Sequence, residues 1–309
     1  IGINEETRDL PGSVIERVPN SDVPSGLLIE MEGWLSQQIP QISEDEWAGG
    51  IRHAKDTLVS QGVTSFQDAT ATNESSHWLK FRTSVDGIGP PLRATVMLGE
   101  EGLKDFDSHK NSHGGQNFPR LGHTKIVITG GSETIYPELR DIARLVQQSH
   151  LRGVPLAIHA VEIDAIAAAL EGWRGIATRA PQTFFAPHRF EHCPESPDWV
   201  IKEFSRLGIS VVVNPGFIYF NGDRYLNTIS ADRLENLYPI RSMQEAHLTV
   251  AAGSDSPVIP SDPIKSIYGA VFRKTAGGHL LNPPESVSVT SALSMYTTAA
   301  AKVTGLEKV

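Results

Sequence analysis

The chain has 309 residues, of which 39% are hydrophobic and 20% are charged, so it can bury a sizeable core and is not a disordered protein. Its net charge of −9 and its lack of any lysine or arginine run argue against nucleic acid and anionic membranes as partners. The single cysteine, Cys193, excludes an intramolecular disulfide and favours a cytoplasmic location. Its longest apolar stretches, such as 211–213, are far shorter than the ~20 residues of a membrane-spanning helix.

Residues 1–42 are expected to form an irregular excursion or β-hairpin, and residues 43–309 a single barrel domain. Short β-prone pieces in the first segment are interrupted by Pro11, Pro19, Pro24 and Pro40. Proline cannot donate a backbone hydrogen bond, so strands in this segment can only be short or lie at an edge. We therefore do not expect the segment to have a core of its own.

From residue 62 onward, short apolar and β-branched runs alternate with longer segments of helical character. Continuous apolar runs are typical of strands that are buried on both faces, as in a parallel sheet. The predicted strands are residues 63–68, 92–98, 125–129, 155–160, 189–193, 209–214 and 248–255.

The segments between these runs are predicted to be helices. Residues 135–151 place five apolar side chains on one stripe and are followed by Gly153, a helix stop signal. Further helices are predicted over residues 43–61, 161–172, 196–207, 231–246, 263–274 and 288–304. Residues 104–120 are predicted to form a mobile surface loop.

The alternation of strands and helices predicts an α/β fold with a parallel sheet. The spacing from Lys125 to His159 is 34 residues, and the spacing from His159 to His192 is 33. A repeat of about 32 residues predicts a (β/α)8 barrel of the TIM type, here incomplete with about seven strands. A doubly wound sheet would show the same alternation, but no glycine-rich phosphate loop follows any predicted strand.

Three side chains from different predicted strands are candidates for an active site. His159, His192 and Asp255 lie at the carboxyl ends of their strands, where barrel enzymes place catalytic groups. Two histidines and a carboxylate can hold a catalytic zinc with an open position for water. Lys125 begins an earlier strand and would also point inward. Taken singly, each has an ordinary alternative, since a histidine in an apolar strand is more often a hydrogen-bonded core residue than a ligand.

Neighbouring residues receive weaker interpretations. Glu191 alternates with His192 along the strand, so it is expected to face away from the barrel interior. Cys193 is expected to be a buried structural thiol. A loop after the strand at 209–214 is expected to line the substrate pocket, with Asn214, Tyr219, Arg224 and Tyr225 as its candidate residues.

Seven segments carry a family resemblance over essentially the whole chain. They are GVTSFQDAT at 62–70, TKIVITGGS at 124–132, LAIHAVE at 156–162, HRFEHCPE at 188–195, VVVNPGFIYFNGDRY at 211–225, AAGSDSPVIPSDPIKSIYGAVFRK at 251–274 and SALSMYTTAAAK at 291–302. In order and spacing they resemble the YtcJ-like branch of the amidohydrolase superfamily. The resemblance implies a metal-dependent hydrolase on a (β/α) barrel that acts on amide, formamide or cyclic amide C–N bonds of small molecules.

The resemblance also implies roles for the candidate residues. Lys125 matches a lysine that can be carboxylated to bridge two metals, and His159 and His192 match histidine ligands. Asp255 matches an aspartate that binds metal and activates the attacking water. These four residues are the predicted metal ligands, and Asp255 is also the predicted catalytic base.

The chain departs from the family pattern at both ends. It contains no His-x-His pair, which the family carries at the end of its first barrel strand, and it stops where the family continues into a β-domain. We therefore expect a fragment that holds at most one zinc or other divalent ion well and is catalytically impaired. Its open sheet edges are expected to pair in a homodimer.

Two other interpretations stay open at this point. One is a catalytically inactive scaffold or binding module that has lost the metal. The other is an isomerase or lyase on the same barrel, which would use a base and no hydrolytic water.

Overall fold

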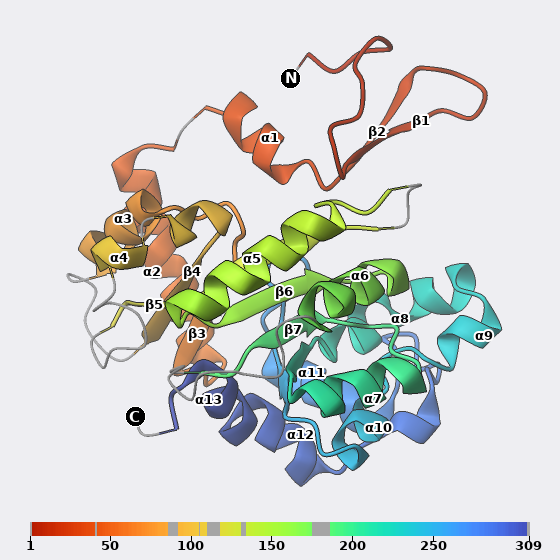
Figure 1. Ribbon diagram of the computed structural model, residues 1–309. Coiled ribbons are helices and arrows are strands. Elements are labelled where there is room, and N and C mark those ends of the chain that lie inside the picture. The colour runs from red at the N-terminus through yellow and green to blue at the C-terminus, as the bar shows by residue number, and fades with distance from the viewer. Residues whose placement is uncertain are drawn as a thin grey trace.

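The computed structural model describes residues 2–40, 42–85, 92–104, 106–109, 118–130, 134–174 and 186–307. Its centre is a seven-stranded sheet whose strands follow each other in chain order (Figure 1). They are β3 (Ser65–Asp68), β4 (Arg93–Leu98), β5 (Arg120–Ile128), β6 (Leu156–Ala160), β7 (Arg189–His192), β8 (Ser210–Val213) and β9 (Val250–Ala252). Every neighbouring pair is parallel, which confirms the predicted incomplete (β/α) barrel with sequential strands.

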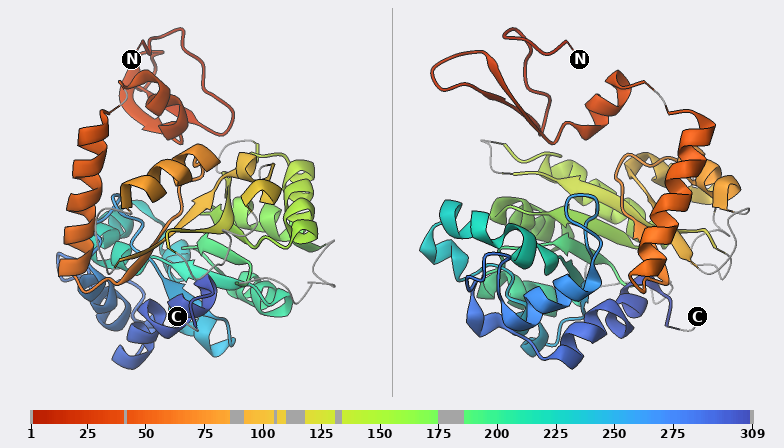
Figure 2. Two further views of the ribbon diagram at one scale, coloured as in Figure 1. Left: turned by 90° about the vertical axis from the view of Figure 1, so that its left-hand side faces the viewer. Right: turned by 180° about the vertical axis from the view of Figure 1, so that it is seen from behind.

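Helices follow the strands and cover the outer face of the curled sheet (Figures 1 and 2). They are α2 (Glu44–Ser60), α3 (Ser75–Val85), α4 (Phe106–His109), α5 (Leu139–Arg152), α6 (Ile163–Arg174), α7 (Asp198–Leu207), α8 (Gly216–Thr228), α9 (Ala231–Leu234), α10 (Ile240–Glu245), α11 (Pro263–Phe272), α12 (Val289–Tyr296) and α13 (Thr298–Thr304). Two 3-10 turns complete them, η1 (Glu100–Leu103) and η3 (Pro283–Glu285). Within the predicted loop 104–120, residues 106–109 form the helical turn α4 and Arg120 already belongs to β5, whereas residues 105 and 110–117 lie outside the described residues.

The helix boundaries have local causes. Ser43 accepts a hydrogen bond from the Glu46 backbone N–H, and the Glu46 carboxylate accepts one from the Ser43 N–H, which forms a capping box at the start of α2. Gly153 and Gly208 end α5 and α7 in the left-handed conformation that glycine favours. The predicted helix 231–246 is instead divided into α9 and α10, because Pro239 interrupts the backbone hydrogen-bonding pattern between them.

The outer face of the sheet is held by apolar packing. Phe190 of β7 and Phe204 of α7 are both fully buried, with ring centroids 4.9 Å apart. The predicted stripe of α5 is buried at Ile142, Leu145 and Val146. The strands can therefore use their other face for the polar side chains that line the barrel interior.

The first segment of the chain stands apart from the barrel (Figures 1 and 2). It forms an antiparallel pair, β1 (Val14–Arg17) and β2 (Pro24–Ile29), followed by α1 (Glu32–Gln38), which the sequence patterns did not predict. Gly12 lies against Tyr136 and Thr129, just beyond the carboxyl end of β5. This hairpin joins neither end of the seven-stranded sheet.

The sheet has two open ends. Within the described residues, no strand pairs with the outer edge of β3 or of β9. The segment after β9 nevertheless lies next to the end of α2, where Ser261 Oγ donates a hydrogen bond of 2.8 Å to Gln61 Oε1. The barrel is therefore bridged at this point by a side-chain contact and not by a strand.

The amino end of the barrel is closed by the last helix. Arg120 and Arg189, at the starts of β5 and β7, are buried and donate hydrogen bonds to the carbonyl oxygens of Thr304 and Val303 in α13. Cations are favourable at the carboxyl end of a helix, where the last carbonyl groups have no partner within the helix. The two arginines therefore fix α13 beneath the sheet. No helix among the described residues combines the length and apolar character that crossing a bilayer requires.

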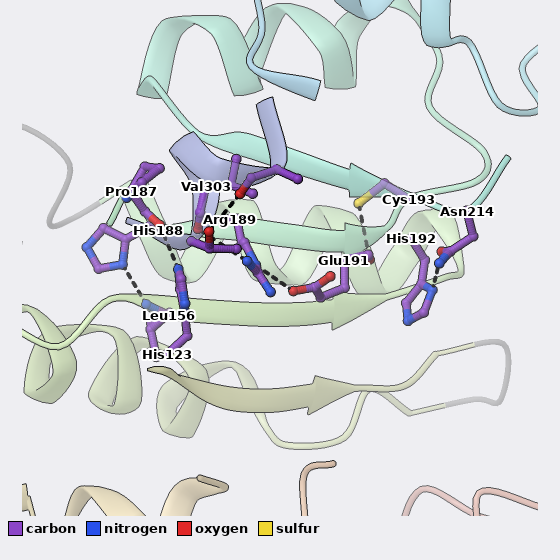
Figure 3. Close-up of polar contacts among 12 residues, drawn as sticks. His123, Leu156, Pro187, His188, Arg189, Glu191, His192, Cys193, Asn214 and Val303 are labelled. Atoms are coloured by element: carbon purple, nitrogen blue, oxygen red, sulfur yellow. Dashed lines mark hydrogen bonds and ion pairs between the residues drawn. The ribbon is translucent and has the colours of Figure 1, made fainter. Parts of the chain in front are cut away.

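Two histidines lie near this closed end, the buried His123 and the partly buried His188 (Figure 3). His123 Nε2 donates to the Pro187 carbonyl oxygen at 3.0 Å, and the Leu156 N–H donates to His188 Nδ1 at 2.9 Å. Burial, followed by the charge of Arg189, holds the pKa of His123 well below its ordinary value. Burial, with a smaller effect of His150, lowers the pKa of His188 to about 3. Both rings are therefore neutral in the folded chain at pH 7.

We predict that acid destabilises the fold through these two histidines. Their folded-state pKa values lie below the unfolded value of about 6.5, so the unfolded chain takes up protons first as the pH falls. The free energy of unfolding should decrease below pH ~6.5 by up to about 1.4 kcal/mol per pH unit for each histidine. Urea unfolding between pH 7.5 and pH 5 measures this slope. His188→Gln should reduce the slope, and His53→Gln, on the exposed surface of α2, is the control. Equal slopes for the wild type and His188→Gln would contradict the assignment.

Candidate active site

The four predicted site residues come from four elements of the barrel. Lys125 lies in β5, His159 in β6 and His192 at the end of β7, and Asp255 follows β9 by three residues. The imidazole rings of His159 and His192 meet edge to face, with centroids 4.4 Å apart. The structure therefore brings the two histidines into direct contact at the carboxyl ends of their strands.

The strand register places the other interior groups in two layers. Val127, His159 and Glu191 are aligned across β5, β6 and β7, and Lys125, Ala157 and Arg189 are aligned one layer below them. Side chains two residues apart on a strand point to the same face. Lys125 is therefore buried beneath the level of His159, and Arg189 and Glu191 share the interior face of β7.

The position of Glu191 corrects the sequence-based expectation that it faces away from the interior. Its carboxylate accepts a hydrogen bond of 2.7 Å from Arg189 Nε, and both side chains are buried (Figure 3). Burial alone would raise the pKa of Glu191, but Arg189, Lys125 and His192 together hold it below its ordinary value. Charged residues of opposite sign at 189 and 191 were a sequence signal for such a pair, since strand alternation places them on one face.

His192 reaches the same side as Glu191 because the backbone changes direction. Its φ is 70° and that of Cys193 is 41°, both in the left-handed region that non-glycine residues rarely adopt. Asp255 also lies in this region, with φ of 59°. Each such residue costs about 1–3 kcal/mol, and such strain is typical of functional sites. Two of the four predicted site residues therefore carry a strained backbone conformation.

The electrostatics of the site favour neutral nitrogen groups. Burial, followed by the effects of His192 and Lys125, holds the pKa of His159 well below its ordinary value. Burial and then Lys125 lower the pKa of His192, while Asp255 and Glu191 act in the opposite sense. Burial also lowers the pKa of Lys125, with Glu191 and Asp255 opposing it. The neutral imidazoles have the lone pairs that a metal ion requires.

The carboxylate of Asp255 completes the set of candidate groups. Burial raises its pKa, and the electrostatic effects of His192 and Lys125 act in the opposite sense. Among the described residues, no three histidine, cysteine, aspartate or glutamate side chains lie close enough together to hold one metal ion. Imidazole nitrogen is a donor that suits a divalent metal, and two neutral imidazoles are in contact here. Further ligands would have to come from Asp255 or a modified Lys125.

Asn214 lies in the short connection between β8 and α8, and its side chain contacts His192 directly. It is 5% exposed, and its side chain lies within 2.7 Å of His192 Nδ1 (Figure 3). Its amide nitrogen donates to the Gly253 carbonyl oxygen at 3.1 Å. Asn214 therefore joins the end of β8 to the ends of both β7 and β9.

The other predicted pocket residues lie on helix α8, which replaces the expected loop. Tyr225 is partly buried, and its hydroxyl lies 3.5 Å from that of Tyr238, which is 4% exposed. Burial raises the pKa of Tyr238, and Tyr225 and Asp255 raise it further. The Tyr238 hydroxyl is therefore close enough to Asp255 for an electrostatic interaction. The ring of Tyr219 packs at a right angle on Tyr268 of α11. Arg224 is exposed.

Tyr238 was missed by the sequence reasoning, as was the residue that holds its backbone. Arg273 is fully buried and donates hydrogen bonds of 3.0–3.1 Å to the carbonyl oxygens of Leu237, Tyr238 and Leu281. Arg273 lies in the segment 251–274 of the family resemblance, but nothing in that segment singled it out, because its role depends on backbone carbonyl groups outside the segment. It fixes the segment that carries Tyr238 beside the site.

We predict that Glu191→Ala is strongly destabilising. Removing one partner of a buried ion pair leaves the other charge uncompensated, which typically costs about 3–5 kcal/mol. The double variant Arg189→Met/Glu191→Leu should recover much of this loss. As a control, Glu203→Ala breaks the more exposed Arg206–Glu203 pair and should change the free energy of unfolding far less. Chemical denaturation of the four chains tests this, and equal losses for Glu191→Ala and Glu203→Ala would contradict it.

Comparison with known proteins gives matches that extend over essentially the whole chain. The sequence profile of the amidohydrolase family matches residues 1–309. The N-substituted formamide deformylase of Arthrobacter pascens is 33% identical over 341 residues, which cover 99% of this chain and 61% of the deformylase. YtcJ of Bacillus subtilis (strain 168), which is named as an amidohydrolase, is 22% identical over 332 residues, with the same 99% and 61% coverage. The chain therefore spans about three fifths of the length of these relatives.

Solved structures share the fold. The crystal structure of an uncharacterized metal-dependent hydrolase from Pyrococcus furiosus has a TM-score of 0.71 at 21% identity, covering 91% of this chain and 61% of that chain. Guanine deaminase from C. acetobutylicum, with guanine bound in its active site, has a TM-score of 0.54 at 15% identity, covering 85% and 64%. Both likenesses concern the arrangement of strands and helices.

Proposed function

We propose that this chain, which belongs to the amidohydrolase family, is a metal-dependent hydrolase that cleaves a non-peptide carbon–nitrogen bond with a metal-activated water. The observation that carries the proposal is the contact between the neutral imidazoles of His159 and His192 at the carboxyl ends of β6 and β7. The relative at 33% identity is named an N-substituted formamide deformylase. We therefore propose a small amide-type substrate, with N-substituted formamides as the first class to test.

Zinc is the proposed metal, because imidazole nitrogens and carboxylate oxygens are ligands that it favours. His159 and His192 would hold it, with Asp255 and a carboxylated Lys125 as further ligands. The burial of Lys125 favours its neutral amine, which is the form that combines with CO2 to give a carbamate. A bound zinc ion would supply a water of lowered pKa and would polarise the substrate carbonyl. We propose at most one well-held ion.

A residue of the chain would then transfer the proton of the attacking water to the leaving nitrogen. Asp255 is proposed to accept the proton from the attacking water and to transfer it to the leaving nitrogen, which is general base and then general acid catalysis. Burial raises the pKa of Asp255, which favours the protonated carboxyl that would pass the proton to the leaving nitrogen. We expect weak turnover, because the open edges at β3 and β9 admit water. Water weakens the electrostatic stabilisation of a transition state.

We predict that zinc binding and hydrolysis depend on the same histidines. His159→Ala and His192→Ala should each lose stoichiometric zinc, measured by elemental analysis, together with activity on a panel of formamides, N-acyl amides and cyclic amides. Asp255→Asn should lower kcat by about 100-fold or more, since general acid–base catalysis typically contributes that much. His53→Gln, far from the site on α2, is the control.

Labelled water separates the alternatives. A hydrolase run in 18O water should place 18O in the acid product, whereas turnover without 18O incorporation would indicate an isomerase or lyase. A specific observation favours the inactive scaffold as second candidate: no group of three ligands is assembled among the described residues. A wild-type chain with neither stoichiometric zinc nor activity would support the scaffold and contradict our proposal.

We also propose that the chain forms a homodimer and works in the cytoplasm. Unpaired strand edges readily associate with other strands, and β3 and β9 each present one in the described structure. The only cysteine, Cys193, is buried and unpaired, which suits a reducing compartment. We predict twice the monomer mass in light scattering. A monodisperse monomer at micromolar concentration would contradict the dimer, and activity confined to an extracytoplasmic fraction would contradict the location.

A further inference from the structure

We propose that Asn214 is a positioning residue that holds His192 in the Nδ1-protonated tautomer and leaves the Nε2 lone pair free on the side of the ring away from Asn214. The geometry of this inference is independent of the reaction, and its consequence for metal binding rests on the proposed function. Three residues carry it: Asn214 after β8 and His192 at the end of β7, both drawn in Figure 3, and Gly253 after β9.

The hydrogen-bond partners determine the orientation of the amide. The Gly253 carbonyl oxygen can only accept, so the group of Asn214 that faces it at 3.1 Å must be the donating Nδ2. The other end of the amide, Oδ1, then faces His192 Nδ1 at 2.7 Å. Because an amide oxygen can only accept, Nδ1 must carry the proton. In a neutral imidazole, Nε2 is then unprotonated.

The surroundings leave Asn214 little freedom to turn. Its side chain is buried at 5% exposure, and its own carbonyl oxygen accepts a hydrogen bond of 3.0 Å from the Phe217 N–H in the first turn of α8. The Gly253 N–H donates to Val213 O at 3.0 Å, which fixes the carbonyl of Gly253 beside the end of β8. Asn214 is therefore held from β8, β9 and α8 at once.

An amide suits this position better than a carboxylate. Aspartate could accept from His192 Nδ1, but it would place a negative charge against the Gly253 carbonyl oxygen and could not donate to it. It would also favour the imidazolium form, which has no lone pair for a metal. Asparagine supplies one donor and one acceptor to two neighbours that need one of each, and it leaves the imidazole neutral.

The tautomer of His192 matters because its ring lies where a metal ligand is proposed. Its ring is in contact with the ring of His159, the other assembled nitrogen ligand, so a tautomer change would put a proton where a lone pair is needed. A hydrogen bond to the non-ligating nitrogen is what usually fixes the tautomer of a metal-bound histidine. Losing such a partner typically lowers metal affinity by 10–100-fold.

The first measurement needs no variant. The full chain is labelled with 15N at histidine and its imidazole tautomers are read at pH 7.5 from long-range 1H–15N correlations, with His192→Gln identifying the His192 signals. We expect the Nδ1–H tautomer at His192 in the zinc-free wild type. An Nε2–H tautomer or an even mixture would overturn the inference.

Substitutions then test Asn214 as the cause. Asn214→Leu, of similar size but without donor or acceptor, should release the tautomer and weaken zinc binding about 10–100-fold in competition with a chromophoric chelator. Asn214→Asp retains the acceptor and should retain the Nδ1–H bond. Asn227→Leu, on the exposed surface of helix α8, is the control and should change neither.

The outcomes separate this inference from the proposed function. A folded Asn214→Leu chain with an unchanged His192 tautomer would overturn the inference, whatever its zinc affinity. A wild type with the expected tautomer but no zinc binding would support the inference and contradict the metal-dependent function alone. If Asn214→Leu does not fold, the wild-type tautomer and Asn214→Asp still decide.

Discussion

At the end of β7 the backbone of His192 and Cys193 adopts φ of 70° and 41°, and this left-handed turn decides where the imidazole of His192 lies. Along a regular strand, His192 would face the outer helices, on the side of Phe190 and opposite Glu191. The turn places it instead against His159 and within hydrogen-bonding distance of Asn214. Without it the barrel would present one histidine at this mouth, and the candidate metal site would not exist.

The interior beneath the histidines is lined by paired charges. Arg189 binds Glu191 and also the carbonyl oxygen of Val303 in α13. Lys125 lies within the same field and interacts with Glu191, Arg189 and Asp255. The buried charges thus connect the closed amino end of the barrel to the open carboxyl end where the site lies.

Much of this arrangement could be predicted from the sequence, because parallel strands buried on both faces leave a readable apolar run. All seven strands were found in this way, and the rule that barrel sites lie at strand ends selected His159, His192 and Asp255 before their positions were known. The contact between His159 and His192 could be anticipated in this way. The roles of all three residues as metal ligands stay predictions.

The rest depends on features that no local pattern encodes. The alternation rule assumed that His192 faces the interior as a regular strand residue, and it therefore placed Glu191 on the outer side. The strand is regular up to Glu191, and the backbone turns only at His192 and Cys193, where the Cys193 N–H donates to the Ala160 carbonyl oxygen of β6. Helix α8 was taken for a loop, because glycine disfavours helices and its buried residues, Gly216, Ile218 and Gly222, give no apolar stripe in the sequence. The contacts of Asn214 with His192 and Gly253, and of Arg273 with Leu237 and Tyr238, span 22 to 39 residues of sequence. Such partners become visible only once the strands are aligned.

The central claim is that His159 and His192 together hold a divalent metal. Anomalous X-ray diffraction at the zinc absorption edge, on crystals of the wild-type chain grown with zinc, tests it most directly. The account predicts an anomalous peak within coordination distance of both imidazoles, on the Nε2 side of His192. Well-ordered crystals with no peak at this position, or with zinc bound only at surface histidines, would contradict it.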